Sequence, residues 1–228
     1  MMRTALFYRD GNFVGPEYFS ALVKSGLPPD LVVPVSRMKQ ESIAIETERT
    51  GGLWSPPPIP EEKITRRFRR IDDPEISRLI ENAGIDVAIQ GGIGILKGNL
   101  LDAPRIGWVN VHPGKLPQYR GNACPEWALL NGDPVVATAH FIDEGIDTGP
   151  VICEARYEIS AAWNYHEFRA NLYRHCARVL VTALERLVAA GPRARQLARP
   201  QSTEGACYWP ALGDKERAAV RDRFGAPS

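Results

Sequence analysis

The 228-residue chain has few cysteines, no long apolar run and almost no net charge. Its four cysteines lie far apart and form no Cys-x-x-Cys pair, which argues against a structural zinc site and a disulfide framework. The apolar run at residues 1–8 is too short for a signal peptide, and no stretch approaches the length of a membrane span. A formal charge of +1 gives no overall field to attract a polyanion. We therefore expect reduced thiols, a cytoplasmic protein, and neither nucleic acid nor a membrane as a partner.

The rest of the composition is that of an ordinary globular protein. Hydrophobic residues make up 44% and charged residues 24% of the chain, close to the averages for packed domains. The length suits one α/β domain with a short appendage. We expect the main, catalytic domain at residues 1–190 and a C-terminal extension at 191–228 that packs on it.

Apolar patterns along the chain predict alternating strands and helices. Short apolar or β-branched runs predict strands at 4–8, 31–35, 85–89, 107–111, 135–142 and 151–159. Amphipathic stretches predict helices at 16–24, 73–83 and 163–190. The prolines between residues 56 and 60 exclude regular structure there. Strands that alternate with helices predict an α/β fold with a mostly parallel sheet, helices on both faces, and ligands beyond the carboxyl ends of the strands.

The densest group of reactive side chains comes at the end of the expected strand 107–111. Residues two apart in a strand point to the same side, so Asn110 and His112 can address one substrate atom. A second segment, 140–150, carries an acidic loop that ends with Asp147 before a Thr-Gly-Pro turn. A carboxylate can orient an imidazole and favour its protonated form, and an amide with an imidazolium can bond an oxyanion. Acyl transfer to an amine requires these functions.

These two segments resemble the signature of the folate-dependent formyltransferase family. The first reads Asn-x-His-Pro-x-x-Leu-Pro-x-Tyr-Arg-Gly over residues 110–121, and the second reads His-Phe-x-Asp-x-x-x-Asp-x-Gly-Pro over residues 140–150. The resemblance is strong over roughly residues 80 to 155. It implies a Rossmann-like α/β fold, 10-formyltetrahydrofolate as the cofactor, and Asn110, His112 and Asp147 as the catalytic residues.

The resemblance also implies two segments that lie against the pterin of the cofactor. They are Gly91, Gly92, Ile93, Gly94, Ile95 and Leu96 before the catalytic strand, and Ile142, Asp143, Glu144, Gly145 and Ile146 before the catalytic aspartate. Glycine permits the close backbone approach that such a contact needs, although an ordinary loop after a strand is the alternative interpretation. Lys97 stands where a dinucleotide fingerprint requires its last glycine, so no such site is expected. His112 and His140 lack further ligands at metal-binding spacing, so no metal is expected either.

The acceptor is predicted from the branches of the resembled family. The tRNA branch carries an additional C-terminal barrel, and the purine-synthesis branch has a Gly- and Ser-rich phosphate loop that residues 9–15 match poorly. The run 120–133 is more similar to the branch that formylates amino sugars, which are often nucleotide-linked. We therefore expect a small polar amine of that kind, bound by Tyr119, Arg120, Asn122 and Glu126.

Other functions remain open at this point. Glycinamide ribonucleotide is the second acceptor, and water as the nucleophile would give a formyltetrahydrofolate hydrolase. A non-catalytic folate- or nucleotide-binding module is a more distant alternative. A homodimer also stays open, and the remaining expected partners are the folate and the amine.

Overall fold

The structure is a computed structural model that describes residues 2–224. Its centre is a six-stranded sheet in the order β2-β1-β3-β4-β6-β7. The strands are β1 (Thr4–Asp10), β2 (Leu31–Arg37), β3 (Val87–Gly91), β4 (Gly107–His112), β6 (Val136–Phe141) and β7 (Val151–Arg156). The first four are parallel, β6 runs antiparallel to β4, and β7 runs antiparallel to β6. The predicted mostly parallel sheet is confirmed; residues 225–228 of the expected extension lie outside the described residues.

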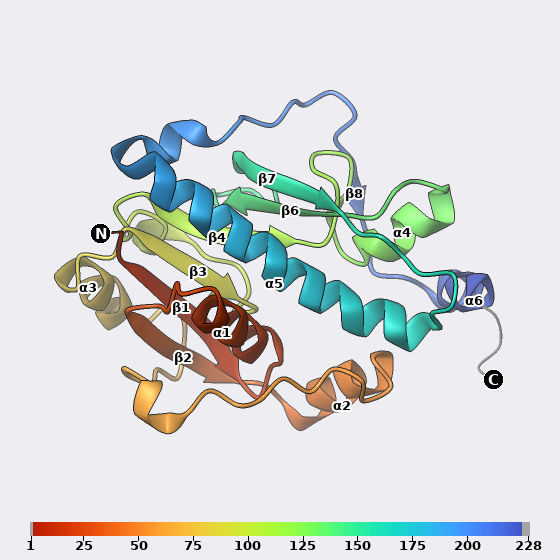
Figure 1. Ribbon diagram of the computed structural model, residues 1–228, viewed down its shortest axis with the longest axis horizontal. Helices are drawn as coiled ribbons and strands as arrows, with labels where there is room; N and C mark the ends of the chain where they lie inside the picture. The colour runs from red at the N-terminus through yellow and green to blue at the C-terminus, as the bar shows by residue number, and fades with distance from the viewer. Residues whose placement is uncertain (1, 225–228) are drawn as a thin grey trace.

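Helices cover both faces of this sheet because side chains alternate along each strand (Figure 1). Leu6 of β1 packs with α1 (Val14–Lys24) and α5 (Tyr165–Ala190) on one face. Its neighbours Ala5 and Phe7 belong to the cluster on the other face, where α3 (Pro74–Asn82) packs. The expected arrangement of helices on both faces is therefore confirmed.

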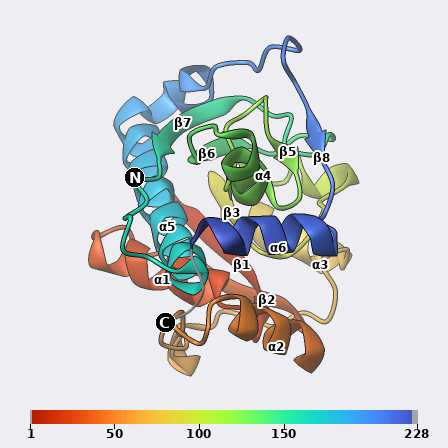
Figure 2. The ribbon, with the colours of Figure 1, turned by 90° about the vertical axis from the view of Figure 1, so that its right-hand side faces the viewer.

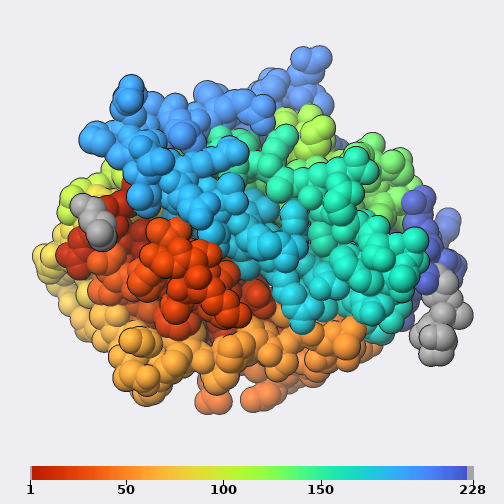
Figure 3. Space-filling model, in the orientation of Figure 1, coloured from red at the N-terminus to blue at the C-terminus, as the bar shows by residue number. Residues whose placement is uncertain are grey.

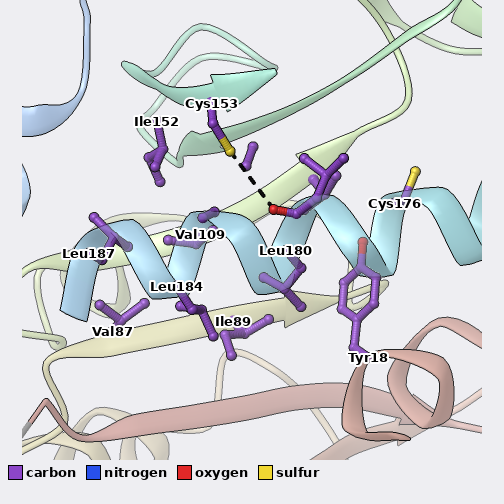
Figure 4. Close-up of a cluster of buried hydrophobic side chains, with 14 of the residues drawn as sticks. Tyr18, Val87, Ile89, Val109, Ile152, Cys153, Cys176, Leu180, Leu184 and Leu187 are labelled. Carbon is purple, nitrogen blue, oxygen red and sulfur yellow. Dashed lines mark hydrogen bonds between the residues drawn. The ribbon is translucent and has the colours of Figure 1, made fainter. Parts of the chain in front are cut away.

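The long helix α5 supplies much of the larger core (Figure 4). Its buried residues Cys176, Leu180, Leu184 and Leu187 follow one another at intervals of three or four, and they face the apolar side chains of β3 and β4. The helix begins with a capping box, in which the Asn164 side chain accepts from the Glu167 amide and the Glu167 side chain accepts from the Asn164 amide. The stripe predicted over 163–190 thus forms the helix that covers the sheet.

The remaining elements are short and lie outside the six-stranded sheet. They are α2 (Gln40–Arg49), α4 (Cys124–Asn131), α6 (Asp214–Arg223), β5 (Arg120–Gly121), β8 (Tyr208–Trp209), and the 3-10 turns η1 (Glu61–Lys63), η2 (Gly98–Leu100) and η3 (Gly191–Leu197). The sequence patterns predicted none of them. Residues 51–60 contain neither helix nor strand, as their prolines indicate.

After η3 the chain returns to the sheet through residues 199–209, which we call the strap. Arg199 forms a backbone bridge with Val151 at the start of β7. Further on, β8 pairs in parallel with β5, and α6 lies beside α4 (Figure 2). The blue atoms of the chain after α5 lie along the upper edge of Figure 3, and the darker blue atoms of α6 lie at its right-hand edge. Over residues 2–224 none of the helices combines the length and apolar character needed to cross a bilayer.

Candidate active site

The antiparallel pairing of β4 and β6 sets Asn110 directly opposite His140. The Asn110 amide nitrogen lies 3.3 Å from His140 Nε2, and His140 Nδ1 lies 2.8 Å from the carbonyl oxygen of Phe141. A carbonyl only accepts hydrogen bonds, so the proton of the neutral ring is on Nδ1 and Nε2 accepts from Asn110. Burial lowers the pKa of His140 to about 4, against an opposing contribution from Asp147. His140 is therefore neutral near pH 7 and fixes the orientation of the Asn110 amide.

His112 is held by the loop that follows β4. Its Nε2 donates to the carbonyl oxygen of Tyr119 at 2.7 Å, and its Nδ1 lies 3.4 Å from a carboxylate oxygen of Asp147. Since Nε2 is committed to a carbonyl, Nδ1 is the ring atom that can take up or release a proton. The ring nitrogen of His112 that can exchange a proton thus faces Asp147.

Gly114 makes the contact between His112 and Tyr119 sterically feasible. A Cβ atom at position 114 would lie 2.6 Å from His112 Nε2 and 2.6 Å from the Tyr119 carbonyl oxygen. Any other residue would push the two groups apart. Gly114 therefore has a local packing role in orienting the histidine.

Asp147 is held in a strained turn. Its φ of 55° is left-handed, a conformation that costs a non-glycine residue on the order of 1–3 kcal/mol and persists only when its surroundings enforce it. The carboxylate accepts from the backbone amide of Gly121 at 3.0 Å. Inside the turn, Asp143 accepts from the Gly145 amide at 3.1 Å and from the Thr148 hydroxyl.

The structure brings the three predicted catalytic side chains together and adds a fourth, His140. His140 Nε2 lies 3.7 Å from the Asp147 carboxylate. Because the ring is neutral, the two groups do not form an ion pair. From the sequence, His140 is considered as a metal ligand beside His112, and no metal is expected there. Across the described part of the chain, no group of three or more His, Cys, Asp or Glu side chains is placed to hold a metal ion. The catalytic roles of Asn110, His112 and Asp147 stay predictions.

Both predicted cofactor segments reach one apolar cluster. Ile93 and Leu96 are buried in it with Trp108, and Ile142 packs against it. Ile95 and Ile146 are instead exposed, with 61% and 45% of their surface accessible. The structure therefore brings the two segments to a common place, while their contact with a pterin stays a prediction.

The first cofactor segment also lines a cavity of about 790 Å³. Ile93, Ile95 and Leu96 contribute apolar surface, and Arg9, Arg69 and Lys97 stand around it. Within residues 2–224 no carboxylate lies at ion-pair distance from these three cations; two other arginines of the cavity, Arg70 and Arg78, pair with Asp72 and Glu75. Asp72, Asp73 and Glu81 line the cavity as well, so it combines apolar walls with more basic than acidic side chains.

The predicted acceptor-binding residues have different surroundings. The Tyr119 hydroxyl bonds to Asp133 and Asn131, and the Arg120 guanidinium donates to Gln201. Glu126 is buried, with 3% of its surface accessible, and pairs with Arg169 and Tyr165. Asn122 is exposed. Their role toward an acceptor stays a prediction.

A second, smaller cavity of about 180 Å³ lies directly beside Asn110. Its walls are mainly apolar and come from α1, β4, α5 and the proline-rich segment: Val14, Tyr18, Trp54, Val111, Pro113, Tyr173 and Cys176. Trp54 stacks on Tyr173, with ring centroids 3.8 Å apart and planes 7° from parallel, and donates its ring N–H to Glu17. Sequence reasoning missed Trp54, because no pattern links residues 51–60 to this place.

Comparison with known proteins identifies the family. The family model described as "Formyl transferase" matches residues 29–184. The chain belongs to this family. Among curated relatives, the methionyl-tRNA formyltransferase of Deinococcus radiodurans is 35% identical over 155 residues, which are 64% of this chain and 47% of the relative. The chain therefore spans about half the length of the curated relatives it matches.

Solved structures of formyltransferases share the fold. Phosphoribosylglycinamide formyltransferase from Streptococcus pneumoniae aligns with a TM-score of 0.60 and 22% identity, covering 82% of this chain and 99% of that one. An N-formyltransferase from Helicobacter canadensis, solved with folinic acid and dTDP-3-aminofucose, aligns with a TM-score of 0.57 and 15% identity. That alignment covers 92% of this chain and 71% of the other. At these identities the likeness establishes the formyltransferase fold.

Proposed function

We propose that this protein transfers the formyl group of 10-formyltetrahydrofolate to the primary amine of a small polar acceptor. One observation carries the proposal. His112 Nδ1, the ring atom free to exchange a proton, faces Asp147 at 3.4 Å in the same site as the Asn110 amide. A proton carrier, its carboxylate and an amide donor are the groups that acyl transfer to an amine requires.

Each of the three residues has one task in the proposed reaction. The folate supplies the formyl group as an activated carbonyl. Asn110 donates an amide N–H to the carbonyl oxygen as negative charge develops there; its other amide hydrogen is directed to His140. His112 Nδ1 takes the proton that the acceptor nitrogen loses, and the Asp147 carboxylate stabilises the resulting imidazolium. The same proton passes to the folate nitrogen as the bond between that nitrogen and the formyl carbon breaks, so that tetrahydrofolate leaves and the ring is neutral again.

The residues around the larger cavity fit a folate. Folates combine a flat ring system with a tail of carboxylates, and the cavity combines apolar walls at Ile93 and Leu96 with the unpaired cations Arg9, Arg69 and Lys97. The cofactor segment proposed from the sequence lines this cavity. We propose that the cations hold the carboxylates of the cofactor.

For the acceptor we propose a nucleotide-linked amino sugar ahead of glycinamide ribonucleotide. The smaller cavity beside Asn110 has aromatic faces and few polar groups. Such walls suit the C–H face of a sugar ring better than a phosphate. In the first β-α turn the Asn12 side chain donates to the carbonyl of Gly91 and accepts from the amide of Gly15. Its polar atoms are thus engaged by the fold and not presented to a phosphate.

A formyl-transfer assay with 10-formyltetrahydrofolate tests both the formyl transfer and the identity of the acceptor. The panel contains nucleotide-linked amino sugars, glycinamide ribonucleotide, hydroxyornithine, methionyl-tRNA, and no amine. We expect an amino sugar to give the highest kcat/KM, in the ordinary enzyme range of about 10⁴ M⁻¹s⁻¹ or more. Activity with glycinamide ribonucleotide or methionyl-tRNA alone would exclude the sugar and retain formyl transfer.

Two further outcomes would replace the proposed function. Release of formate at the same rate with and without amines would identify a hydrolase, in which water is the nucleophile. Tight folate binding without turnover of any acceptor would identify a binding module. Titration calorimetry with folinic acid on the same preparation separates that case from inactive protein.

We also propose that residues 1–190 form the catalytic domain and that residues 191–228 form an extension that completes the site. The strap supports this division because it pairs with β5 and with the start of β7, the two segments adjoining the Asp147 turn. Removal of residues 191–228 should abolish turnover. A truncated protein with unchanged kcat and KM would contradict the proposal.

A further inference from the structure

One side chain of the strap, Gln201, reaches both segments that hold Asp147. Its amide nitrogen lies 2.9 Å from the carbonyl oxygen of Asp147 and 2.7 Å from that of Gly149. Its amide oxygen lies 2.8 Å from Nη2 and 3.3 Å from Nε of Arg120. Arg120 precedes Gly121, whose backbone amide donates to the Asp147 carboxylate. Gln201 therefore links the turn of Asp147 to the strand that binds its carboxylate.

The partners of Gln201 determine which way its amide points. Carbonyl oxygens only accept hydrogen bonds and a guanidinium only donates them. The NH₂ group must therefore face Asp147 and Gly149, and the oxygen must face Arg120. The reverse orientation would set oxygen against two carbonyl oxygens and N–H groups against the guanidinium. All the hydrogen-bonding groups of this side chain are used in the orientation seen.

The backbone around Gln201 is fixed on both sides. Arg199 exchanges two backbone hydrogen bonds of 2.8 Å with Val151. Later in the strap, Trp209 stacks on Tyr119 with ring centroids 5.4 Å apart. The amide of Gln201 is thus presented to Asp147 from a tethered segment, which reduces the entropy lost in making its hydrogen bonds.

Asp147 needs such external support. Its left-handed backbone is maintained only by its surroundings, and a small rotation of the turn would move the carboxylate away from His112 Nδ1, 3.4 Å distant. The contacts of Asp143 act within the turn and do not fix the turn relative to β4. The ends of the loop are bonded to the sheet, where the Ile142 amide donates to the carbonyl of Trp108 at 2.8 Å and the Phe141 amide donates to that of Pro150 at 2.9 Å. At Asp147 itself the bonds to other segments come from the Gly121 amide and the Gln201 side chain.

We propose that Gln201 is a positioning residue, which holds the Asp147 carboxylate against His112 by donating to the carbonyl oxygens of Asp147 and Gly149. This inference rests on the proposed function. It differs from a general stabilising role of the strap, because it assigns the effect to the two N–H donors of one side chain.

Three substitutions separate the donors from the rest of the side chain. Gln201→Leu removes every hydrogen bond at similar size. Gln201→Glu keeps the length and the acceptor for Arg120 but sets oxygen against the two carbonyl oxygens. Gln196→Leu is the matched control, the same exchange at an exposed residue of η3. Circular dichroism and the thermal midpoint establish that each variant is folded.

In the formyl-transfer assay we expect Gln201→Leu and Gln201→Glu each to lower kcat by about tenfold to a hundredfold, with KM for either substrate little changed. A displacement of about 1 Å in a catalytic group has an effect of this size. Gln196→Leu should match the parent protein. In the Asp147→Asn background, Gln201→Leu should add little further loss, since the group it positions is already disabled. A kcat of Gln201→Glu near that of the parent protein, or fully additive losses, would overturn the proposal.

A second measurement does not depend on catalysis. The ring ¹H–¹⁵N signals of His112 should shift in both Gln201 variants and stay in place in Gln196→Leu, because only the former change the carboxylate beside the ring. If no acceptor is formylated, the proposed function fails, and these signals still decide the positioning role. Unchanged His112 signals in a folded Gln201→Glu protein would refute it.

Discussion

Two parts of the candidate site are held in different ways. Asn110, His112 and His140 lie on the neighbouring strands β4 and β6, and the ladder between the strands sets their spacing. Asp147 lies in a left-handed turn outside the sheet, and its position depends on hydrogen bonds from Gly121 and from Gln201. A sheet position follows from local sequence, whereas a turn position is determined by contacts made from afar. The sheet should therefore tolerate local changes better than the turn.

The strongest test asks whether the two parts contribute equally to the chemical step. His112→Ala removes the proposed proton carrier of the sheet, and Asp147→Asn removes the carboxylate of the turn. We expect each to lower turnover by at least about a hundredfold, the usual effect of losing a proton-transfer or charge-stabilising group. Initial rates measured on folded protein check this. His166→Ala, which removes a histidine bonded to the carbonyl of Arg49, is the control. Near-normal turnover in either variant would take that residue out of the mechanism.

The next test probes the turn through its packing. A Cβ atom at Gly149 would lie 1.9 Å from the carbonyl oxygen of Phe141, so the turn must move away from β6. We expect Gly149→Ala to lower the free energy of unfolding by about 3 kcal/mol, the upper range for overpacking. At Gly26 a Cβ atom would meet open space, and the only strain comes from the left-handed φ of 72°. Gly26→Ala should therefore lower the free energy of unfolding by about 1 kcal/mol. Urea denaturation of both variants compares them, and equal losses would show that the turn is not tightly packed.

A third test uses pH to probe the sheet part. The pKa of His140 is about 4 in the folded protein and 6.5 as an ordinary value, so below pH 6.5 the unfolded chain binds a proton that the folded protein does not. Stability should fall as the pH drops from 6.5 to 4, with His140 contributing about 3 kcal/mol of the loss. Asp147, His112 and Asp143 are the charged or titratable groups that act on the His140 ring. His140→Gln should remove most of this slope, and an unchanged slope would contradict the assignment.

The smallest effect is expected at a helix end remote from the turn. Asn164→Ala removes the capping box of α5, and we expect a loss of about 1 kcal/mol in the free energy of unfolding with turnover unchanged. The thermal midpoint and the initial rate check this together. A large fall in turnover would mean that the helix covering the sheet affects the site as directly as the turn does.

Much of the fold could be predicted because its signals are local. The runs that form β1 to β4 are apolar, and α5 carries a regular stripe of buried residues. The helix α2 was missed because it buries no residue and so has no stripe. In α4 the buried Cys124, Pro125 and Glu126 are consecutive, which obscures the helical period.

The candidate site divides in the same way. The motifs predict that Asn110 and His112 share a strand face, which the register of β4 bears out. They do not reveal that Trp54 lines the cavity beside Asn110, or that Gln201 supports Asp147. Such contacts join residues that lie far apart in the sequence, and the residue types involved occur in many loops. No periodicity or spacing marks them in a single sequence.

The distance in sequence between Asp147 and Gln201 has a consequence for biosynthesis. Gln201 follows Asp147 by 54 residues, so at synthesis rates of about 5–20 residues per second it leaves the ribosome roughly 3 to 11 s later. During that interval the nascent sheet can already assemble around Asn110 and His112. The turn of Asp147 has no strap to bind it until residues 199–209 have been made. Under the role proposed for Gln201, the Asp147 carboxylate is the last group of the candidate site to reach its position, and it does so once the strap has docked.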